Sequence, residues 1–360
     1  MTQRRRTTAP NSRSLRIGLV GPVAQSIPPK RSGSVETVTA MLADGLVTRG
    51  HDVTLFATGS SVTNARLHSI FSKGYNADKS LWPWELCELF NLAAAVERAN
   101  TFDLIHYQAK YYPMSLAYTR LSPVPVLQTL HHAPSVPEIN LWSQYGEAPF
   151  IAVSRAQARL LSNLNVVATV HHAVDPSVFY FAKIPEDYLL FLGRFAKGKG
   201  VLEAIDVASR ADKRLIMAAA ENDYFRNTIA PLVDNHRILY AGEVDQPTKV
   251  SLLRSAQALL YPLQTREPFG LVLVESMMCG TPVAALDCGA VRELVDDGVT
   301  GHIFTSLDDL VNGIPRVLAL NRERVRTRAV EQFGPDRMVD EHLKVYSQLV
   351  STRQQPKSSA

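Results

Sequence analysis

The stretch that decides the fold reads Glu267-Pro268-Phe269-Gly270-Leu271-Val272-Leu273-Val274-Glu275, followed by Ser276-Met277-Met278-Cys279-Gly280-Thr281-Pro282. Pro268 suits the first turn of a helix, where its missing N–H is not needed. We then expect the backbone N–H groups of Phe269, Gly270 and Leu271 to point out of the helix N-terminus. Such an end binds anions, because its donors are unpaired and the helix dipole is positive there.

Two acidic residues bracket this predicted helix. Glu267 precedes the helix and can reach whatever binds at its mouth, whereas Glu275 lies two turns in, on a helix that is otherwise built to be buried. A buried carboxylate needs partners, because an unpaired buried charge is costly. Sugar or ribose hydroxyls donate hydrogen bonds and would serve. The alternative is an amphipathic helix that carries two glutamates by chance.

Short apolar runs alternate with helical patterns along the whole chain. In the first half we expect strands at residues 15–20, 52–57, 102–106, 124–129, 150–153 and 165–170. In the second half we expect strands at residues 188–192, 215–219, 238–241, 258–262 and 282–286. This β-α-β alternation indicates parallel, doubly wound sheets, and a length of 360 residues favours two domains. Ligands bind at the carboxyl ends of such strands and in clefts between domains.

The acidic pair and its surroundings resemble the signature of the retaining glycosyltransferases of family 4. In that family two glutamates stand eight positions apart, as Glu267 and Glu275 do, around a Phe-Gly-Leu turn. A small residue and Gly-Thr-Pro-Val follow, which matches Cys279 and residues 280–283 of this chain. The resemblance covers roughly residues 15 to 350 and is stronger in the second half.

The resemblance implies a GT-B fold, which is an α/β fold of two Rossmann-like domains with doubly wound parallel sheets that face an interdomain cleft. We expect an acceptor-binding domain at residues 15–180 and a donor-binding domain at residues 181–335. The last helix, at residues 336–350, is expected to cross back onto the first domain. Residues 1–14 and 351–360 are expected to be disordered tails, the first of them basic.

A loop rich in glycine and cations follows the predicted strand at 188–192, and it reads Gly193-Arg194-Phe195-Ala196-Lys197-Gly198-Lys199-Gly200. Glycines such as Gly193 permit a tight turn and close backbone approach. Arg194 can hold phosphate oxygens through its planar fork, while Lys199 supplies a mobile point charge. In the family that the chain resembles, these two cations hold the nucleotide diphosphate. The alternative is a solvated basic loop.

The loop after the first predicted strand departs from the family pattern. The family has two adjacent glycines and then, one residue on, a glutamate; this chain has Gly33, Ser34 and Glu36. We expect Gly33 and Ser34 to approach the sugar diphosphate, with the Ser34 hydroxyl donating to a phosphate. An ordinary helix-capping loop is the alternative. No Gly-x-Gly-x-x-Gly follows the first strand, which argues against a nicotinamide dehydrogenase.

Histidines end two of the predicted strands. His131 matches, by register, a histidine that contacts the donor sugar in the family. His106 is expected either at the acceptor side or in the core, and His172 in a packed connector between the domains. Trp82 and Trp84 lie in a long stretch without motifs, where they either stack on an acceptor or pack in the core.

Composition limits the class of protein. Hydrophobic residues make up 46% of the chain and charged residues 20%, which is typical of a globular domain, and no apolar run approaches the roughly 20 residues that cross a bilayer. The basic start lacks the apolar segment of a secretory signal, so it is either a solubilising tail or weakly attracted to anionic lipids. Three scattered cysteines suit a reducing compartment. We therefore expect a cytoplasmic protein, with peripheral contact at the inner membrane face as an open alternative.

The sequence predicts a retaining hexosyltransferase. Arg194 and Lys199 would stabilise the departing diphosphate, Glu275 would hold the ribose, and Glu267 with the backbone at 269–271 would position the sugar. The donor is expected to be a nucleotide-diphosphate sugar, UDP-linked by preference, and the acceptor a small molecule, glycan or lipid. We expect no metal, no other cofactor and no nucleic acid partner. A GT-B sugar-nucleotide epimerase and a non-catalytic sugar-nucleotide or carbohydrate binder are the alternatives; the oligomeric state is open.

Overall fold

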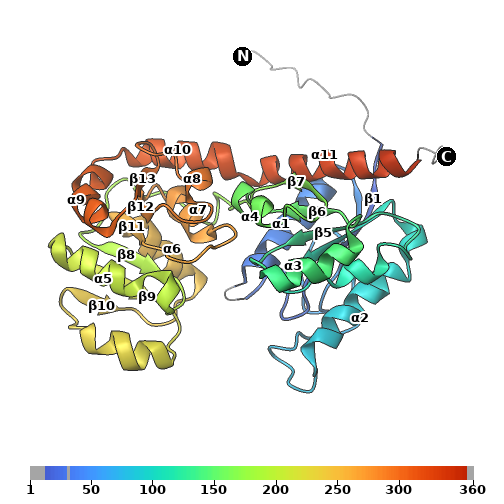
Figure 1. Cartoon of the computed structure of the whole chain (residues 1–360), viewed down its shortest axis with the longest axis horizontal. Helices are drawn as coiled ribbons and strands as arrows, with labels where there is room; N and C mark the ends of the chain where they lie inside the picture. The colour runs from blue at the N-terminus through green and yellow to red at the C-terminus, as the bar shows by residue number, and fades with distance from the viewer. Residues whose placement is uncertain (1–12, 31–32, 355–360) are drawn as a thin grey trace, which may run out of the picture.

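A computed structural model describes residues 13–30 and 33–354 of the chain. Within these residues the chain forms two lobes, each built on one parallel sheet and covered by helices (Figure 1). The first sheet has seven strands in the order β3-β2-β1-β4-β5-β6-β7. Their bounds are β1 (Arg16–Val20), β2 (Asp52–Phe56), β3 (Arg66–His68), β4 (Leu104–Ala109), β5 (Val126–Leu130), β6 (Phe150–Ala152) and β7 (Val166–Thr169).

The second sheet has six strands among the described residues, in the order β10-β9-β8-β11-β12-β13. Their bounds are β8 (Leu189–Leu192), β9 (Leu215–Ala218), β10 (Ile238–Tyr240), β11 (Ala258–Tyr261), β12 (Val283–Leu286) and β13 (Gly301–Phe304). The strand pairs of both sheets are parallel; for example, Leu19 of β1 stands opposite Leu55 of β2 and His106 of β4. The doubly wound parallel architecture predicted from the sequence is confirmed.

Helices cover both faces of each sheet. Their bounds are α1 (Ser34–Thr48), α2 (Trp84–Val96), α3 (Val136–Trp142), α4 (Arg155–Leu160), α5 (Val201–Arg210), α6 (Gln246–Ser255), α7 (Leu271–Met278), α8 (Val291–Leu294), α9 (Leu307–Leu318), α10 (Arg322–Phe333) and α11 (Pro335–Gln354). Helices α1 and α11 pack on one face of the first sheet, α2 and α3 on the other. In the second lobe α6, α7, α8 and α10 share one core cluster, and α5 and α9 the other. Strands buried on both faces explain the continuous apolar runs in the sequence.

The last helix returns to the first lobe. In Figure 1, α11 leaves the second lobe and extends along the first. Its Met338 and Tyr346 are fully buried in the core that contains Leu42 of α1, and Arg49 pairs with Asp340 at 2.7 Å. The helix continues to Gln354, so residues 351–354, which the sequence assigned to a tail, are helical. The predicted tails at 1–12 and 355–360 lie outside the described residues.

Candidate active site

The carboxyl ends of the strands from both lobes face a cleft. A cavity of about 1080 Å³ in this cleft is lined by Gly33, Ser34 and Glu36 from the first lobe and by Leu271 and Glu275 from the second. The structure therefore brings together, from segments more than 200 residues apart, several side chains that the sequence predicted to bind the donor.

Glu267 lies at the centre of a small polar cluster in the second lobe. Its Oε2 atom accepts a hydrogen bond from Lys199 Nζ at 2.9 Å and another from the Tyr261 hydroxyl at 2.5 Å. Burial and the nearby Glu267 raise the pKa of Tyr261 far above its usual value, so the phenol keeps its proton. The loop that ends at Gly200 and the acidic motif are thus in contact. Sequence analysis missed Tyr261, whose only signal is a polar atom at the end of an apolar strand.

The start of α7 differs from the prediction. The helix begins at Leu271, with Gly270 as its N-cap at φ 103°, a left-handed conformation that favours glycine. Pro268 therefore lies in the preceding loop, and its carbonyl accepts a hydrogen bond from Ser154 at 2.5 Å. The prediction that Pro268 occupies the first turn is wrong, because the chain turns sharply at Gly270.

Because of this turn, residue 269 does not share the environment of residues 270 and 271. The Phe269 side chain is buried, and its ring centroid lies 5.0 Å from that of His172 in the connector. The N–H groups of Gly270, Leu271 and Val272 donate no hydrogen bond to any described residue. The mouth of α7 therefore presents unpaired donors, which is the anion-binding arrangement that the sequence predicted one residue earlier.

Glu275 is held by a lysine from a neighbouring helix. Lys249 of α6 places Nζ 2.7 Å from Glu275 Oε1, and the same ammonium lies 5.1 Å from the centroid of the Phe179 ring. The Glu275 side chain is 14% exposed, so the second carboxylate of the motif is partly buried and compensated. Sequence analysis missed Lys249, because nothing in the local pattern of α6 marks it.

Arg194 differs from every cation described so far. It is exposed, and it makes no ion pair or side-chain hydrogen bond within residues 13–30 and 33–354. The loop that carries it is packed tightly at its other end: at Gly200, with φ 78°, a Cβ atom would lie 2.0 Å from the Pro262 carbonyl oxygen. At Gly193 a Cβ would meet nothing within 4 Å. The loop is therefore anchored beside the acidic motif while Arg194 is free to bind a ligand.

In the first lobe, Gly33 is the N-cap of α1 and Ser34 is its first residue. Glu36 is buried, and its Oε1 atom accepts from Lys110 Nζ at 2.9 Å. Its Oε2 atom is buried without a partner among the described residues. A Cβ on Gly33 would lie 2.9 Å from that oxygen, which explains glycine at this position. Lys110 is a further residue that sequence analysis missed.

His131 is half-buried and linked to other side chains through both ring nitrogens. Nε2 lies 2.8 Å from Gln108 Oε1, and Nδ1 lies 3.3 Å from His172 Nε2. Because Gln108 offers an oxygen here, Nε2 carries the proton. Burial is the main cause that lowers the pKa of His131 to about 3. The ring is therefore neutral at physiological pH.

The other aromatic residues divide between core and surface. His106 is fully buried between Tyr346 and Thr129, at 2.6 and 2.8 Å, so it belongs to the core and does not line the acceptor side. His172 is buried in the connector, as expected. Trp82 is 77% exposed, which rules out core packing for it, and Trp84 stacks on an exposed tyrosine, Tyr112.

Two properties of the described residues bear on other ligands and partners. They contain no group of three or more His, Cys, Asp or Glu side chains arranged to hold a metal ion. In the same part of the chain, every helix is too short or too polar to cross a lipid bilayer.

The two parallel-sheet lobes that face a cleft define the GT-B fold. Two family models match the chain: Glycosyltransferase Family 4 at residues 35–178 and Glycosyl transferases group 1 at residues 181–332. The protein belongs to the group 1 glycosyltransferases of family 4, and it is a transferase. This confirms the family and the fold that the acidic motif predicted.

Among similar proteins is the phosphatidyl-myo-inositol mannosyltransferase of Mycobacterium tuberculosis (strain ATCC 25618 / H37Rv), which is 28% identical over 321 residues, or 80% of this chain and 82% of the relative. N-acetyl-alpha-D-glucosaminyl L-malate synthase of Bacillus anthracis is 23% identical over 363 residues, 87% of this chain and 93% of the relative. The crystal structure of Anabaena HepE in complex with UDP and glucose superposes with a TM-score of 0.70 at 17% identity, covering 93% of this chain and 100% of that chain.

Proposed function

We propose that this glycosyltransferase moves a hexose from a nucleotide-diphosphate sugar to an acceptor hydroxyl with retention of the anomeric configuration and without a metal ion. The observation that carries the proposal is the cluster at the mouth of α7. There Glu267 accepts from Lys199 and from Tyr261, and the Tyr261 hydroxyl lies beside Gly270, since a Cβ there would be 3.0 Å from it. The N–H groups of Gly270 to Val272 have no partner among the described residues. Arg194, which has none in the same part of the chain, belongs to the same anchored loop as Lys199.

The diphosphate is the group that this cluster suits. Negative charge grows on the diphosphate as its bond to the sugar breaks, and donors fixed in advance at developing charge usually supply the largest catalytic effect. Arg194 offers a planar fork and Lys199 a point charge, while the mouth of α7 adds backbone donors. These groups do the work that a divalent cation does in other phosphate sites, which supports the proposal of a metal-independent reaction.

Other residues of the site are assigned to the ribose and to the sugar, the two parts of the nucleotide sugar on either side of the diphosphate. Glu275, compensated by Lys249, offers its free oxygen to the ribose hydroxyls. Glu267 accepts from the sugar hydroxyls, and Lys199 can turn from that carboxylate to a phosphate oxygen. Gly33 and Ser34 close over the sugar from the first lobe. His131, which is uncharged at physiological pH, contacts the sugar without competing for the diphosphate.

In the transfer step, the bond between the anomeric carbon and the diphosphate oxygen breaks while the acceptor oxygen bonds to the same carbon. The acceptor attacks from the face that the diphosphate leaves, so the configuration is kept. The departing diphosphate oxygen takes the proton of the acceptor hydroxyl, which balances the step without a separate base. Closure of the two lobes excludes water that would otherwise hydrolyse the donor.

We propose UDP as the nucleotide of the donor. The GT-B neighbour that binds UDP and glucose supports this choice, whereas the mycobacterial relative is a mannosyltransferase, which makes a mannose donor the main competitor. The cysteines Cys87, Cys279 and Cys288 are all free thiols, which supports a reducing, cytoplasmic location.

Two measurements test the function. A thermal-shift screen with UDP, GDP, ADP and dTDP should show one nucleotide raising the melting temperature, because a ligand that binds the folded state alone stabilises it. Incubation of the protein with the matching sugar nucleotide and an acceptor in EDTA should release nucleoside diphosphate and yield the retained anomer. Binding without release would favour a non-catalytic binder, and an inverted product or a need for metal would overturn the mechanism.

A further inference from the structure

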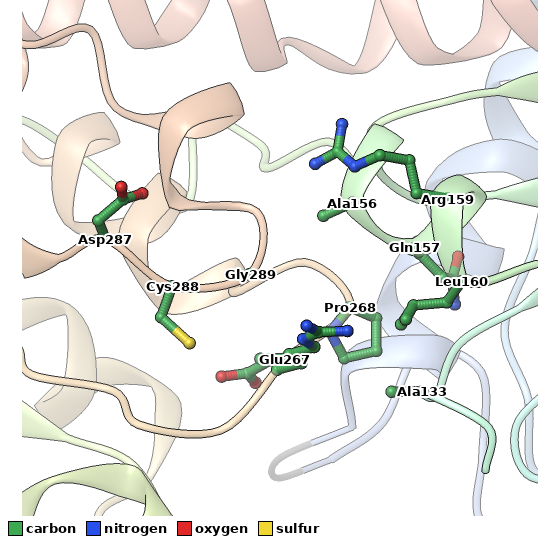
Figure 2. Close-up of a pocket in the computed structure, with 11 residues that line it drawn as sticks. Ala133, Ala156, Gln157, Arg159, Leu160, Glu267, Pro268, Asp287, Cys288 and Gly289 are labelled. Atoms are coloured by element: carbon green, nitrogen blue, oxygen red, sulfur yellow. The ribbon is translucent and has the colours of Figure 1, made fainter. Parts of the chain in front are cut away.

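A second cavity lies between the lobes, and Glu267 is part of its lining. Its volume is about 510 Å³. Ala133 and α4 residues of the first lobe form one wall, and residues 266–268 and 287–289 of the second lobe form the other (Figure 2). Because Glu267 belongs both to this lining and to the Lys199 cluster, a molecule in the cavity would be adjacent to the donor sugar.

The two positive charges that line this cavity have no partners, unlike its two negative charges. Of its described lining residues, four are charged: Arg159, Arg266, Glu267 and Asp287. Both carboxylates already have partners outside the lining, since Lys199 lies 2.9 Å from Glu267 and Arg292 lies 2.8 Å from Asp287. Neither Arg159 nor Arg266 makes an ion pair or side-chain hydrogen bond within the described part of the chain, and both are exposed. Two positive charges are left uncompensated.

The backbones that carry the two arginines are held firmly from opposite lobes. Arg159 lies on α4, whose first turn is capped by the Ser154 hydroxyl at 2.9 Å from Gln157 N and by Glu293 at 2.6 Å from Ala156 N. Figure 2 shows the Arg159 side chain extending from α4 toward the loop that holds Cys288. On the other wall, a Cβ on Gly289 would lie 2.9 Å from the Glu267 carbonyl oxygen, so this loop packs directly on the segment that carries Arg266.

We propose that the acceptor of this enzyme carries an oxyanion, a phosphate or a carboxylate, that Arg159 and Arg266 bind together. A guanidinium forms two parallel hydrogen bonds with either group. Arginines on both walls let one anion bridge the lobes and place the attached hydroxyl beside Glu267. The inference rests on the proposed function for its second test below, but the first test is independent of any activity.

Cys288 is a built-in reporter of the charge in this cavity. It lines the cavity, whereas Cys87 and Cys279 are buried. Its alkylation should be followed by peptide mass spectrometry with iodoacetate, which is anionic, and iodoacetamide, which is neutral. Burial raises the pKa of the Cys288 thiol, and the nearby Arg266 lowers it by a smaller amount, so both reagents are compared at pH 8.5 and only their rate ratio is used.

The double variant Arg159→Ala/Arg266→Ala should lower the iodoacetate-to-iodoacetamide ratio at Cys288 about threefold, as expected for losing two nearby charges in water at moderate salt. Inorganic phosphate should slow alkylation of the wild-type protein but not of the double variant. The control is Arg214→Ala, which removes an exposed arginine just before β9, at the edge of the sheet away from the cleft. An unchanged ratio in the double variant, or equal phosphate protection in both proteins, would overturn the anion site.

Transfer is then measured with matched acceptors that differ in the anion: myo-inositol 1-phosphate against myo-inositol, L-malate against its diamide, and phosphatidylinositol vesicles as the lipid source of the same phosphate. At least one anionic acceptor should exceed its neutral partner tenfold or more in kcat/KM. Arg159→Ala and Arg266→Ala should each raise the KM of that acceptor about tenfold, with the donor KM and the Arg214→Ala enzyme unchanged.

The outcomes separate the two proposals. Transfer to neutral acceptors at equal rates, or unchanged acceptor KM in both arginine variants, contradicts the oxyanion acceptor and leaves the transferase function standing. Absence of nucleoside diphosphate release with every donor and acceptor contradicts the proposed function, while the Cys288 ratio still decides whether the cavity attracts anions.

Discussion

The two walls of the cleft are built from different chemistry. The second lobe presents charged side chains in compensated pairs, Lys199 with Glu267 and Lys249 with Glu275, beside an arginine that has no partner. The first lobe adds one such pair to the cavity, Lys110 with Glu36, and it also contains His131, a half-buried neutral ring linked to Gln108 and His172. We propose a division of labour in which the second lobe neutralises the diphosphate, while the His131 side of the first lobe contacts the uncharged sugar hydroxyls.

The largest effect on activity is expected when a cation of the second lobe is removed. Arg194→Ala and Lys199→Ala should each lower kcat/KM by about 10²- to 10³-fold, because each removes a donor aimed at the charge that develops on the diphosphate. Arg194 has no partner within residues 13–30 and 33–354, so Arg194→Ala should leave the melting temperature unchanged. Steady-state kinetics with Arg214→Ala as the matched control checks this, and wild-type turnover in both cleft variants would remove the role assigned to the second lobe.

The buried histidines of the first lobe predict the next largest effect, which is on stability. Burial lowers the pKa of His131 to about 3 and that of His342 to about 4, whereas the unfolded chain titrates near 6.5. As the pH falls below 6.5, the unfolded state binds protons that the folded state does not. Each such histidine should then lower the free energy of unfolding by about 1.4 kcal/mol per pH unit.

Urea denaturation between pH 7.5 and 5 measures this slope. His131→Gln should reduce this slope by about 1.4 kcal/mol per pH unit, because it removes one group that binds a proton in the unfolded state alone. A urea midpoint that stays constant over this pH range would show that these histidines do not remain neutral in the folded protein.

Glu275 predicts a smaller effect on binding. Glu275→Gln keeps the shape of the side chain but replaces a carboxylate that accepts hydrogen bonds from the ribose, so the Kd of the nucleotide should rise about tenfold. Isothermal titration calorimetry measures it. Glu331→Gln, at an exposed position on α10, is the control, and equal affinity in both variants would exclude ribose contact at Glu275.

The smallest effect is expected where the lobes touch. Glu293 of α8 accepts hydrogen bonds from the first N–H groups of α4, including Ala156 N at 2.6 Å, and lies 3.2 Å from His171 Nε2. Glu293→Gln keeps an acceptor but removes the charge at the positive end of α4, so the free energy of unfolding should fall by about 1 kcal/mol. A chemical melt measures the change; an equal change in Glu331→Gln would show that the contact contributes nothing specific.

The site residues of the second lobe could be recognised from the sequence, whereas their partners could not, and the reason is physical. In the second lobe the functional groups sit on short segments whose spacing is set by one turn or one helix, so Arg194, Lys199, Glu267 and Glu275 could be recognised from their local pattern. Their partners Tyr261 and Lys249 come from other elements, and only the packing of β11 and α6 brings them close. No local signal could have paired them.

One wrong prediction and one open alternative have equally specific causes. Pro268 suits a first helical turn, but Gly270 adopts a left-handed conformation that starts α7 three residues later than Pro268. For His106 the sequence left the core and the acceptor side open, and the returning helix α11 decides for the core because its Tyr346 covers the ring. Both cases depend on tertiary contacts that a propensity or a strand boundary does not contain.

The most direct test of the account is a structure with a bound nucleoside diphosphate. The diphosphate should bind at the mouth of α7, within hydrogen-bonding distance of Arg194, Lys199 and the N–H groups that follow Phe269. The ribose hydroxyls should donate hydrogen bonds to Glu275. A diphosphate bound instead between Arg159 and Arg266, with the mouth of α7 empty, would contradict it.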